Sequence, residues 1–289
     1  MPSLKAIKKR ITSVNNTKKI MKAMNLVAAS KLQKAKNRLD NVRPMYSDIK
    51  DLMEKIRAGV SDDMEVPFAE EREVKNVAYI VLTSDRGLCG AYNALVSKEA
   101  FAYVDGMNKK DIGEKIIAVG TKGWDYFRRR NKEIILRCEG PSEATAFADA
   151  EALGHKVTEM YKSGEVDEVY IVYTHFESVL SHIPYIEKLL PLKTASSEDF
   201  DPGSSTMSYD PDPITFLEHA VPMYLNMTIF GAMIESAVCE YASRMTSMDS
   251  ATRNASDIID DLTLEFNRKR QGIITQEITE IVSGANALQ

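Results

Sequence analysis

Residues 4–39 read LKAIKKRITSVNNTKKIMKAMNLVAASKLQKAKNRL, and alternate steps of three and four through this stretch meet mostly apolar side chains. The row comprises Leu4, Ile7, Ile11, Val14, Lys18, Met21, Asn25, Ala28, Leu32, Ala35, Leu39, Val42, Tyr46, Ile49, Met53 and Ile56. A sustained repeat of about 3.5 residues is typical of a coiled-coil seam. The pattern predicts a helix over residues 1–59, with Ser3 as its N-cap and a kink or division at Pro44.

The same steps find an apolar row near the other end of the chain. It comprises Val238, Tyr241, Met245, Met248, Thr252, Ala255, Ile259, Leu262, Phe266, Lys269 and Ile273. No proline follows Pro222, so the pattern predicts a C-terminal coiled-coil helix over residues 216–289. Its uninterrupted part, residues 223–282, would be roughly 90 Å long at the usual helical rise.

The two apolar rows are expected to pair, because an exposed stripe of this length is unstable in water. Residues 1–39 hold eleven Lys or Arg and no Asp or Glu, whereas residues 217–289 hold ten acidic and five basic residues. Opposite charges beside a seam favour pairing. The sequence therefore predicts one long antiparallel coiled coil of the two ends, with an ordinary helical bundle as the alternative.

The middle of the chain, residues 74–193, has the pattern of an α/β domain. Apolar runs at 77–82, 115–119, 133–136, 168–174 and 183–192 alternate with helical patterns at 92–107, 124–130 and 143–163. Such alternation predicts a doubly wound, mainly parallel sheet of the Rossmann type. Residues 194–215 are rich in Ser, Asp and Pro and are predicted to be a linker.

The segment Thr83–Asn93 follows a predicted strand, where α/β folds place phosphate-binding turns. It has neither the GxGxxG pattern nor GxxxxGK[ST] with its phosphate-binding lysine. We therefore interpret it as a structural turn in which Gly87 and Gly90 are needed for folding. Nucleotide binding is the alternative.

The cysteines and histidines form no recognisable site. Cys89, Cys138 and Cys239 are far apart, which argues against a disulfide framework or zinc site and favours a reducing compartment. Cys89 is expected to be buried and inert, and His175 and His182 to lie on neighbouring strands. We predict no catalytic, cofactor-binding or metal-binding residues.

The basic N-terminal segment requires an acidic partner, which could be nucleic acid, a membrane surface or a protein. No aromatic residue occurs before Tyr46, so base stacking is not available and a protein partner is favoured. The uncharged stretch His219–Ile234 is too short to span about 30 Å of hydrocarbon and is predicted to be a buried helix start. No direct lipid insertion is expected.

Several motifs resemble those of the gamma subunit of rotary F-type ATP synthases, and they occur in the family's order along the whole chain. They are ITSVNNTKKIMKAM (11–24), VAASKL (27–32), SDRGLCG (84–90), SRMTSM (243–248), ATRNA (251–255), FNRKRQ (266–271) and IITQEITEIVSGA (273–285). One departure is Ala91, where the family usually has a second glycine.

The resemblance implies a non-catalytic central rotor shaft that couples ion flow through the membrane c-ring to ATP synthesis or hydrolysis at the beta subunits. The coil would run through the ring of alpha and beta subunits. The α/β domain would be a foot that binds the epsilon subunit and the c-ring, at the cytoplasmic face of the cell membrane. The alternatives are a nucleotide- or phosphate-handling α/β enzyme with helical arms and a coiled-coil nucleic-acid binder.

The family motifs also imply the residues that would contact the surrounding subunits. The predicted rotor–stator contacts are Met24, Arg244, Arg268, Arg270, Gln271 and Thr275. A bearing tip is predicted from Ile273, Ile274, Ile278, Ile281 and Val282. Apolar contacts would suit such a bearing, because directional bonds would hold one angle and oppose rotation.

Overall fold

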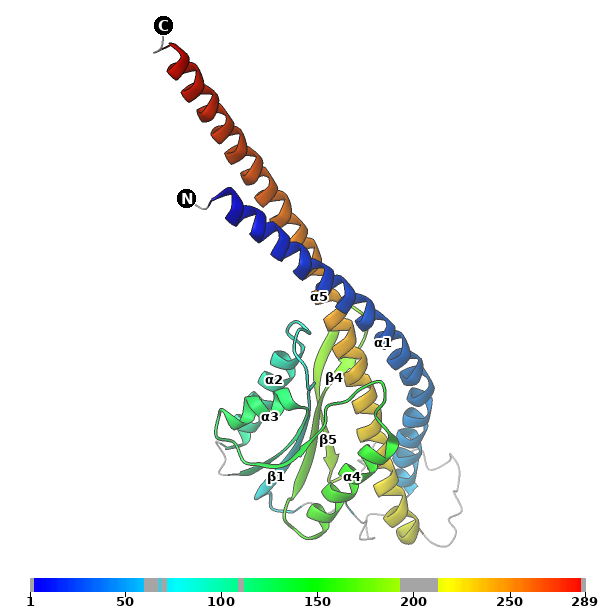
Figure 1. The fold of residues 1–289 in the computed structure, drawn as a ribbon. Helices are drawn as coiled ribbons and strands as arrows, with labels where there is room; N and C mark the ends of the chain where they lie inside the picture. Colours follow the sequence, from blue (N-terminus) through cyan, green and yellow to red (C-terminus); the bar gives the residue numbers. More distant parts are fainter. Residues whose placement is uncertain (1–2, 60–67, 69–71, 109–111, 193–212, 287–289) are drawn as a thin grey trace. The chain divides into compact units, whose positions relative to one another are not determined.

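The computed structural model describes residues 3–59, 68, 72–108, 112–192 and 213–286 (Figure 1). The elements are α1 (Leu4–Gly59), β1 (Asn76–Leu82), α2 (Tyr92–Asn108), β2 (Gly113–Val119), α3 (Thr121–Arg128), β3 (Ile134–Cys138), α4 (Phe147–Lys162), β4 (Glu168–Phe176), β5 (His182–Leu190) and α5 (Pro213–Asn286). They belong to two compact units. The coil unit comprises Met1–Ala28 and Arg244–Gln289, and the base unit comprises Ala29–Ser243.

The coil unit pairs the start of α1 with the end of α5. Ser3 caps α1, since its Oγ accepts a hydrogen bond from the Ala6 N–H at 3.3 Å. The Asn25 side-chain amide donates to the Met245 carbonyl at 2.8 Å. The seam positions of this unit are buried or half-buried as far as Ile273, and Ile7, Ala28, Met248, Ala255 and Leu262 are the buried ones. The predicted antiparallel coiled coil is confirmed.

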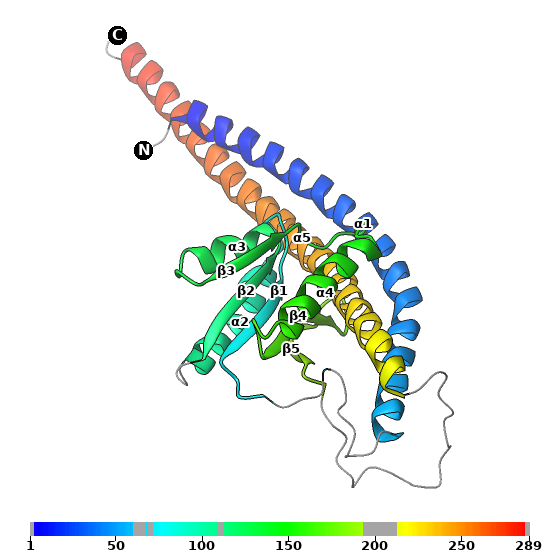
Figure 2. The ribbon, with the colours of Figure 1, turned by 90° about the horizontal axis from the view of Figure 1, so that it is seen from below.

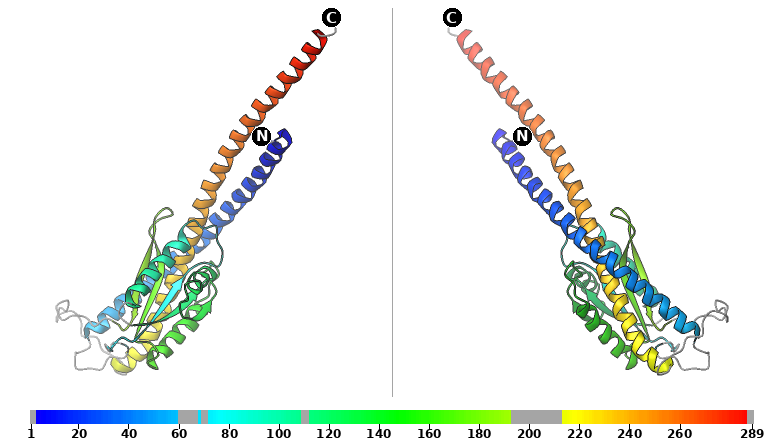
Figure 3. Two further views of the ribbon diagram at one scale, coloured as in Figure 1. Left: turned by 90° about the vertical axis from the view of Figure 1, so that its left-hand side faces the viewer. Right: turned by 90° about the vertical axis from the view of Figure 1, so that its right-hand side faces the viewer.

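Helix α5 continues past the start of α1 (Figure 3). The contact between Asn25 and Met245 sets the register, so Leu4 lies opposite about Phe266. The remaining residues of α5, from Asn267 onward, extend roughly 30 Å further at the usual helical rise. This part of α5 has no helix of this chain beside it among the described residues.

The base unit is built on a five-stranded sheet of order β3-β2-β1-β4-β5. The β1–β2, β1–β4 and β2–β3 pairs are parallel, and only β4–β5 is antiparallel. Helices α2 and α3 lie on one face and α4 on the other, together with part of α5 (Figures 1 and 2). The predicted doubly wound, mainly parallel sheet is confirmed.

The first half of α5 forms part of the core of the base unit. The stretch from His219 to Ile234, predicted to be a buried helix start, is largely buried, although His219 and Met223 are exposed. Gly154 of α4 makes this packing possible, because a Cβ at that position would lie 2.0 Å from Asn226 Oδ1. None of the described helices is long and apolar enough to cross a membrane.

Two boundaries differ from the sequence-based expectation. Most of the predicted linker, residues 194–215, lies outside the described residues, but its last three residues already belong to α5. Proline is well tolerated at the first position of a helix, where no N–H is required, and α5 begins at Pro213. Helix α1 runs through Pro44 without division.

Glu143, in the loop before α4, contacts both long helices within the base unit. Its carboxylate pairs with Lys31 of α1 at 2.7 Å and accepts a hydrogen bond from the hydroxyl of Tyr241 on α5. The Arg38 guanidinium donates to the carbonyls of Glu143 and Thr145 at 2.8 and 2.6 Å. Burial by itself would raise the pKa of Glu143, but the hydrogen bonds from Lys31 and Tyr241 outweigh it and lower the pKa to about 2.

We expect Glu143 to make stability depend on acid. Its pKa is lower in the folded than in the unfolded chain, so its contribution is present above the ordinary carboxyl pKa and is lost as the pH falls toward about 2. Glu143→Gln should lower the free energy of unfolding at neutral pH by about 1–3 kcal/mol. It should also flatten the loss of stability between about pH 5 and about pH 2.

Urea unfolding at a series of pH values would measure both effects. Glu151→Gln, which removes an exposed carboxylate from α4, is the matched control. An acid dependence in Glu143→Gln as steep as in the unaltered chain would contradict the assignment.

Candidate functional site

Met24 and Arg244, two of the six predicted contact residues, lie at the same level of the coil unit. Each precedes one member of the hydrogen bond between Asn25 and the Met245 carbonyl, and each is half-buried. Their side chains therefore lie at the margin of the seam. At this position they can both support the coil and contact another molecule.

An apolar row on α1 that the sequence analysis did not single out passes through Met24. Ile20, Met24 and Val27 are spaced by four and three residues and so share one face of the helix. Ile20 is 61% exposed and Val27 is 56% exposed. We call these three residues the α1 stripe. The signal in the sequence was that each precedes a seam position by one residue.

The other four predicted contact residues lie near or beyond the end of the paired part of α5. Arg268, Arg270, Gln271 and Thr275 are all exposed. The Thr275 hydroxyl donates to the Gln271 carbonyl at 2.9 Å, within the helix. The six predicted residues therefore form two groups, at two levels of the coil unit.

The predicted bearing tip is an exposed apolar surface. Ile273 is half-buried, whereas Ile274, Ile278, Ile281 and Val282 are exposed. Steps of four, three and four place Gln271, Thr275, Ile278 and Val282 on one helical face. Polar and apolar members thus share a continuous face along an unpaired stretch of helix.

These surfaces can bind a partner, but they carry no catalytic set. Large exposed apolar side chains in a row are typical of interaction surfaces. Among the described residues, no group of three His, Cys, Asp or Glu side chains could hold a metal ion. The exposed apolar rows therefore favour a protein contact.

The turn between β1 and α2 is closed by its own side chains. The Asn93 side chain accepts a hydrogen bond from the Ser84 N–H at 2.9 Å, and its amide lies 3.1 Å from Cys89 Sγ. Cys89 is buried, as predicted, and its carbonyl accepts a hydrogen bond from Ser243 of α5. The turn thus joins β1 to two helices, which supports the structural interpretation.

Asp85, in the same turn, occupies the start of helix α3. Its carboxylate accepts hydrogen bonds from the Thr121 N–H and hydroxyl and from the Gly140 N–H, at 2.7–2.8 Å. Burial would raise the pKa of Asp85, but these hydrogen bonds lower it. The N–H groups at a helix start are those that bind phosphate in nucleotide-binding folds. Here an aspartate of the chain itself engages them.

Of the remaining thiols, Cys239 is buried and Cys138 is half-buried. Burial raises the pKa of the Cys138 and Cys239 thiols, so both favour the neutral form. His175 and His182 lie on the neighbouring strands β4 and β5, as predicted. His175 Nδ1 lies 3.1 Å from Glu235.

Comparison with known proteins gives matches over the whole chain. The family model described as ATP synthase matches residues 3–288. The ATP synthase gamma chain of Desulforamulus reducens is 41% identical over 289 residues, covering all of both chains. That of Alkaliphilus metalliredigens is 42% identical over 290 residues and covers 98% of each.

Solved structures share the fold at lower identity. A chain of the Euglena gracilis mitochondrial ATP synthase, in a structure of OSCP, F1 and c-ring, has a TM-score of 0.66 at 17% identity. The match covers 99% of this chain and 94% of that one. A chain of the Tetrahymena thermophila mitochondrial ATP synthase central stalk and c-ring has a TM-score of 0.60 at 22% identity, covering 80% and 99%.

The two glycines of the β1–α2 turn should differ in their tolerance of alanine. Gly90 has a φ of 56°, in the left-handed region, so Gly90→Ala should cost roughly 1–2 kcal/mol. Gly87 lies outside that region, and the nearest atom to a Cβ there is Lys122 Cε at 4.0 Å. We therefore expect Gly87→Ala to be tolerated, in contrast to the sequence-based expectation that folding requires this glycine.

Urea unfolding of the two alanine variants would test this difference. Gly87→Ala should unfold close to the unaltered chain, and it serves as the matched control for Gly90→Ala. Equal losses of stability in the two variants would be inconsistent with this account.

Proposed function

Since the chain belongs to the ATP synthase gamma family, it is the non-catalytic central shaft of an F-type ATP synthase, and we propose that its two contact levels touch the catalytic ring. Its partners are the alpha and beta subunits around the coil, the epsilon subunit, and the c-ring. Ion flow turns the c-ring and the shaft together, and the shaft couples that rotation to ATP synthesis or hydrolysis at the beta subunits.

The lower contact level comprises the α1 stripe and Arg244. The observation that carries this assignment is the apolar row of Ile20, Met24 and Val27, in which Ile20 and Val27 are exposed and Met24 is half-buried. Arg244 adds a cation beside it, suited to acidic groups of a surrounding subunit. The apolar face of the α1 stripe thus differs from the other exposed positions of residues 1–39, which are rich in Lys and Arg.

The upper level comprises Arg268, Arg270, Gln271 and Thr275, followed by the bearing tip. The first four offer hydrogen bonds, and Ile274, Ile278, Ile281 and Val282 offer apolar surface. Apolar contacts have little directional preference, so they support the end of a shaft without holding it at one angle. The polar side chains of Arg268, Arg270, Gln271 and Thr275 can form different hydrogen bonds with the different subunits that they face.

The proposed contacts act by shifting conformational populations. Each beta subunit has open and closed forms, and a shaft face that binds one form better shifts the equilibrium toward it. A difference of about 1.4 kcal/mol between faces changes a site's equilibrium tenfold. The coil can supply such a difference because its apolar and basic faces are distinct.

Within the cell, we propose a peripheral position for the chain at the cytoplasmic face of the cell membrane. The partnership with a c-ring supports this location, because the c-ring is the membrane component of the complex. The free cysteines Cys89, Cys138 and Cys239 also fit a reducing compartment. Binding to the complex, not insertion in lipid, holds the chain there.

Arg270→Ala combined with Gln271→Ala should lower the coupled ATPase rate without unfolding the chain. Both side chains are exposed, so the coil does not depend on them. The measurement is ATPase turnover of alpha and beta subunits assembled with the variant, together with its thermal unfolding. Normal turnover in the double variant would sink the assignment of these two residues.

Val27→Asp should lower the turnover of the assembled enzyme by about tenfold, because it places a charge in an apolar contact worth roughly 1–2 kcal/mol. Asn15→Asp is the matched control, since it adds the same charge at an exposed position of α1 away from the stripe. Steady-state ATPase assays with equal amounts of assembled complex would compare them. Similar turnover in both variants would count against the α1 stripe.

A further inference from the structure

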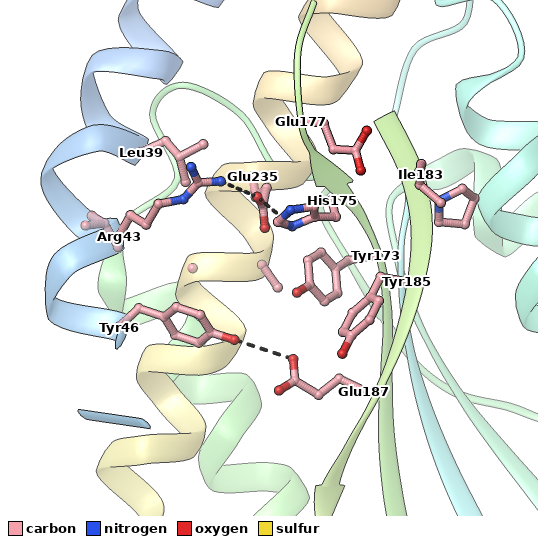
Figure 4. A pocket seen from close by; sticks show the side chains of 14 residues that line it. Leu39, Arg43, Tyr46, Tyr173, His175, Glu177, Ile183, Tyr185, Glu187 and Glu235 are labelled. Carbon is pink, nitrogen blue, oxygen red and sulfur yellow. Dashed lines mark hydrogen bonds and ion pairs between the residues drawn. The ribbon is translucent and has the colours of Figure 1, made fainter. Parts of the chain in front are cut away.

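A cavity of about 450 Å³ lies in the base unit, between the β4–β5 hairpin and the two long helices (Figure 4). Its walls come from four elements far apart in the sequence: α1, β4, β5 and α5. The volume is within the range of sites that bind small organic molecules. The features described above for the coil unit do not involve it.

Three tyrosine rings line this cavity. Tyr46 comes from α1, Tyr173 from β4 and Tyr185 from β5. The Tyr173 and Tyr185 rings meet edge to face, with centroids 5.7 Å apart. Tyr173 is buried, whereas Tyr185 is 48% exposed and so accessible to an entering molecule. On the α5 side, Gly231 and Ala232 are small, and the Tyr46 ring packs close to Gly231.

The charged groups around the cavity are mainly carboxylates. Among the described lining residues, Glu177, Glu187 and Glu235 are accompanied by His175 and by Arg43, whose side chain always carries a positive charge. Glu235 Oε1 is held by Arg43 at 3.0 Å, by His175 Nδ1 at 3.1 Å and by a backbone N–H. Glu187, on β5, accepts a long hydrogen bond of 3.4 Å from the Tyr46 hydroxyl.

Among the described residues that line the cavity, carboxylates outnumber the permanently cationic side chains. Burial raises the pKa of Tyr46 and of Tyr173, and the charges of Glu187 and Glu235 raise both further. The phenols therefore remain neutral at physiological pH, and they present uncharged aromatic faces beside carboxylates. Such surroundings favour a cation and repel phosphates and carboxylic acids.

We propose that this cavity binds an alkylammonium group, a primary amine on a short apolar chain. The ammonium would lie at Glu187, and the apolar chain would cross the faces of Tyr185 and Tyr46. Carboxylates combined with aromatic rings are the recognised means of binding organic cations. A bare metal ion suits the site less well, because the described residues contain no group of three ligands able to hold one.

A matched series of probes tests the charge requirement. Butylamine, butanol and butyrate share one chain length and differ in charge, so their binding to the full chain can be compared by titration calorimetry. Butylamine should bind at least about tenfold more tightly than butanol, and butyrate should not bind. Butanol binding as tightly as butylamine would overturn the proposal.

Two variants test the location. Glu187→Gln should weaken butylamine binding at least about tenfold, whereas Glu277→Gln, at an exposed position of the coil unit, should leave it unchanged. Backbone amide resonances of Ile183 and Ala232 should shift on titration, because both residues line the cavity. Unchanged affinity in Glu187→Gln, or no shift at either residue, would refute the assignment.

The amine could belong to a free polyamine or to a lysine of a partner subunit, and assembly distinguishes the two sources. If the alpha, beta and epsilon subunits abolish butylamine binding, a partner's lysine fills the site. If affinity is retained in the complex, a free amine is the ligand. Both outcomes require that the isolated chain binds butylamine, and failure there rejects the proposal for either source.

Discussion

The antiparallel pairing of α1 with α5 is the interaction on which the coil unit depends. Buried alanines at Ala28 and Ala255 allow the two backbones to approach closely, and Ile7, Met248 and Leu262 fill the remaining seam. The hydrogen bond from Asn25 to the Met245 carbonyl selects one register, because a slip along the seam would leave a half-buried amide without its partner. The level at which each exposed side chain lies, and the length of α5 left unpaired, follow from that register.

Within the base unit, a different kind of contact holds α1 and α5 to the rest of the unit. Glu143 binds groups of α1 and α5, and Glu235 of α5 binds Arg43 of α1 together with His175 and a backbone N–H of β4. These are directional, charge-assisted hydrogen bonds, and they resist sliding of a helix over the sheet more than apolar packing would. A shaft that receives torque at its base requires such fixed attachment. The coil unit instead exposes apolar residues such as Ile20, Val27, Ile274, Ile278, Ile281 and Val282 within an otherwise largely polar and charged surface.

The α/β domain shows how a fold associated with nucleotide binding serves another purpose. Its sheet order is usual for such folds and a turn follows β1, but Asp85 of this turn accepts hydrogen bonds from the Thr121 N–H at the start of α3 and from the Gly140 N–H. Asn93 and Ser84 close the neighbouring turn, and Ser243 ties it to α5. Polar groups that could hold a phosphate thus hold the domain together, which agrees with a role as an attachment base in a non-catalytic subunit.

The sequence by itself determined the coil and the sheet, because both follow from local periodicity: the seam from Leu4 to Ile56, its counterpart from Val238 to Ile273, and the apolar runs of the strands. The family motifs likewise placed the six contact residues, whose contacts remain predictions. Tertiary structure decided which of these side chains stay exposed, and it added Ile20 and Val27 to the face of Met24. It also decided which groups Glu143 and Glu235 bind, and it formed the tyrosine-lined cavity. Glu143 lies about a hundred residues from both Lys31 and Tyr241, and no pattern along a chain records contacts over such separations.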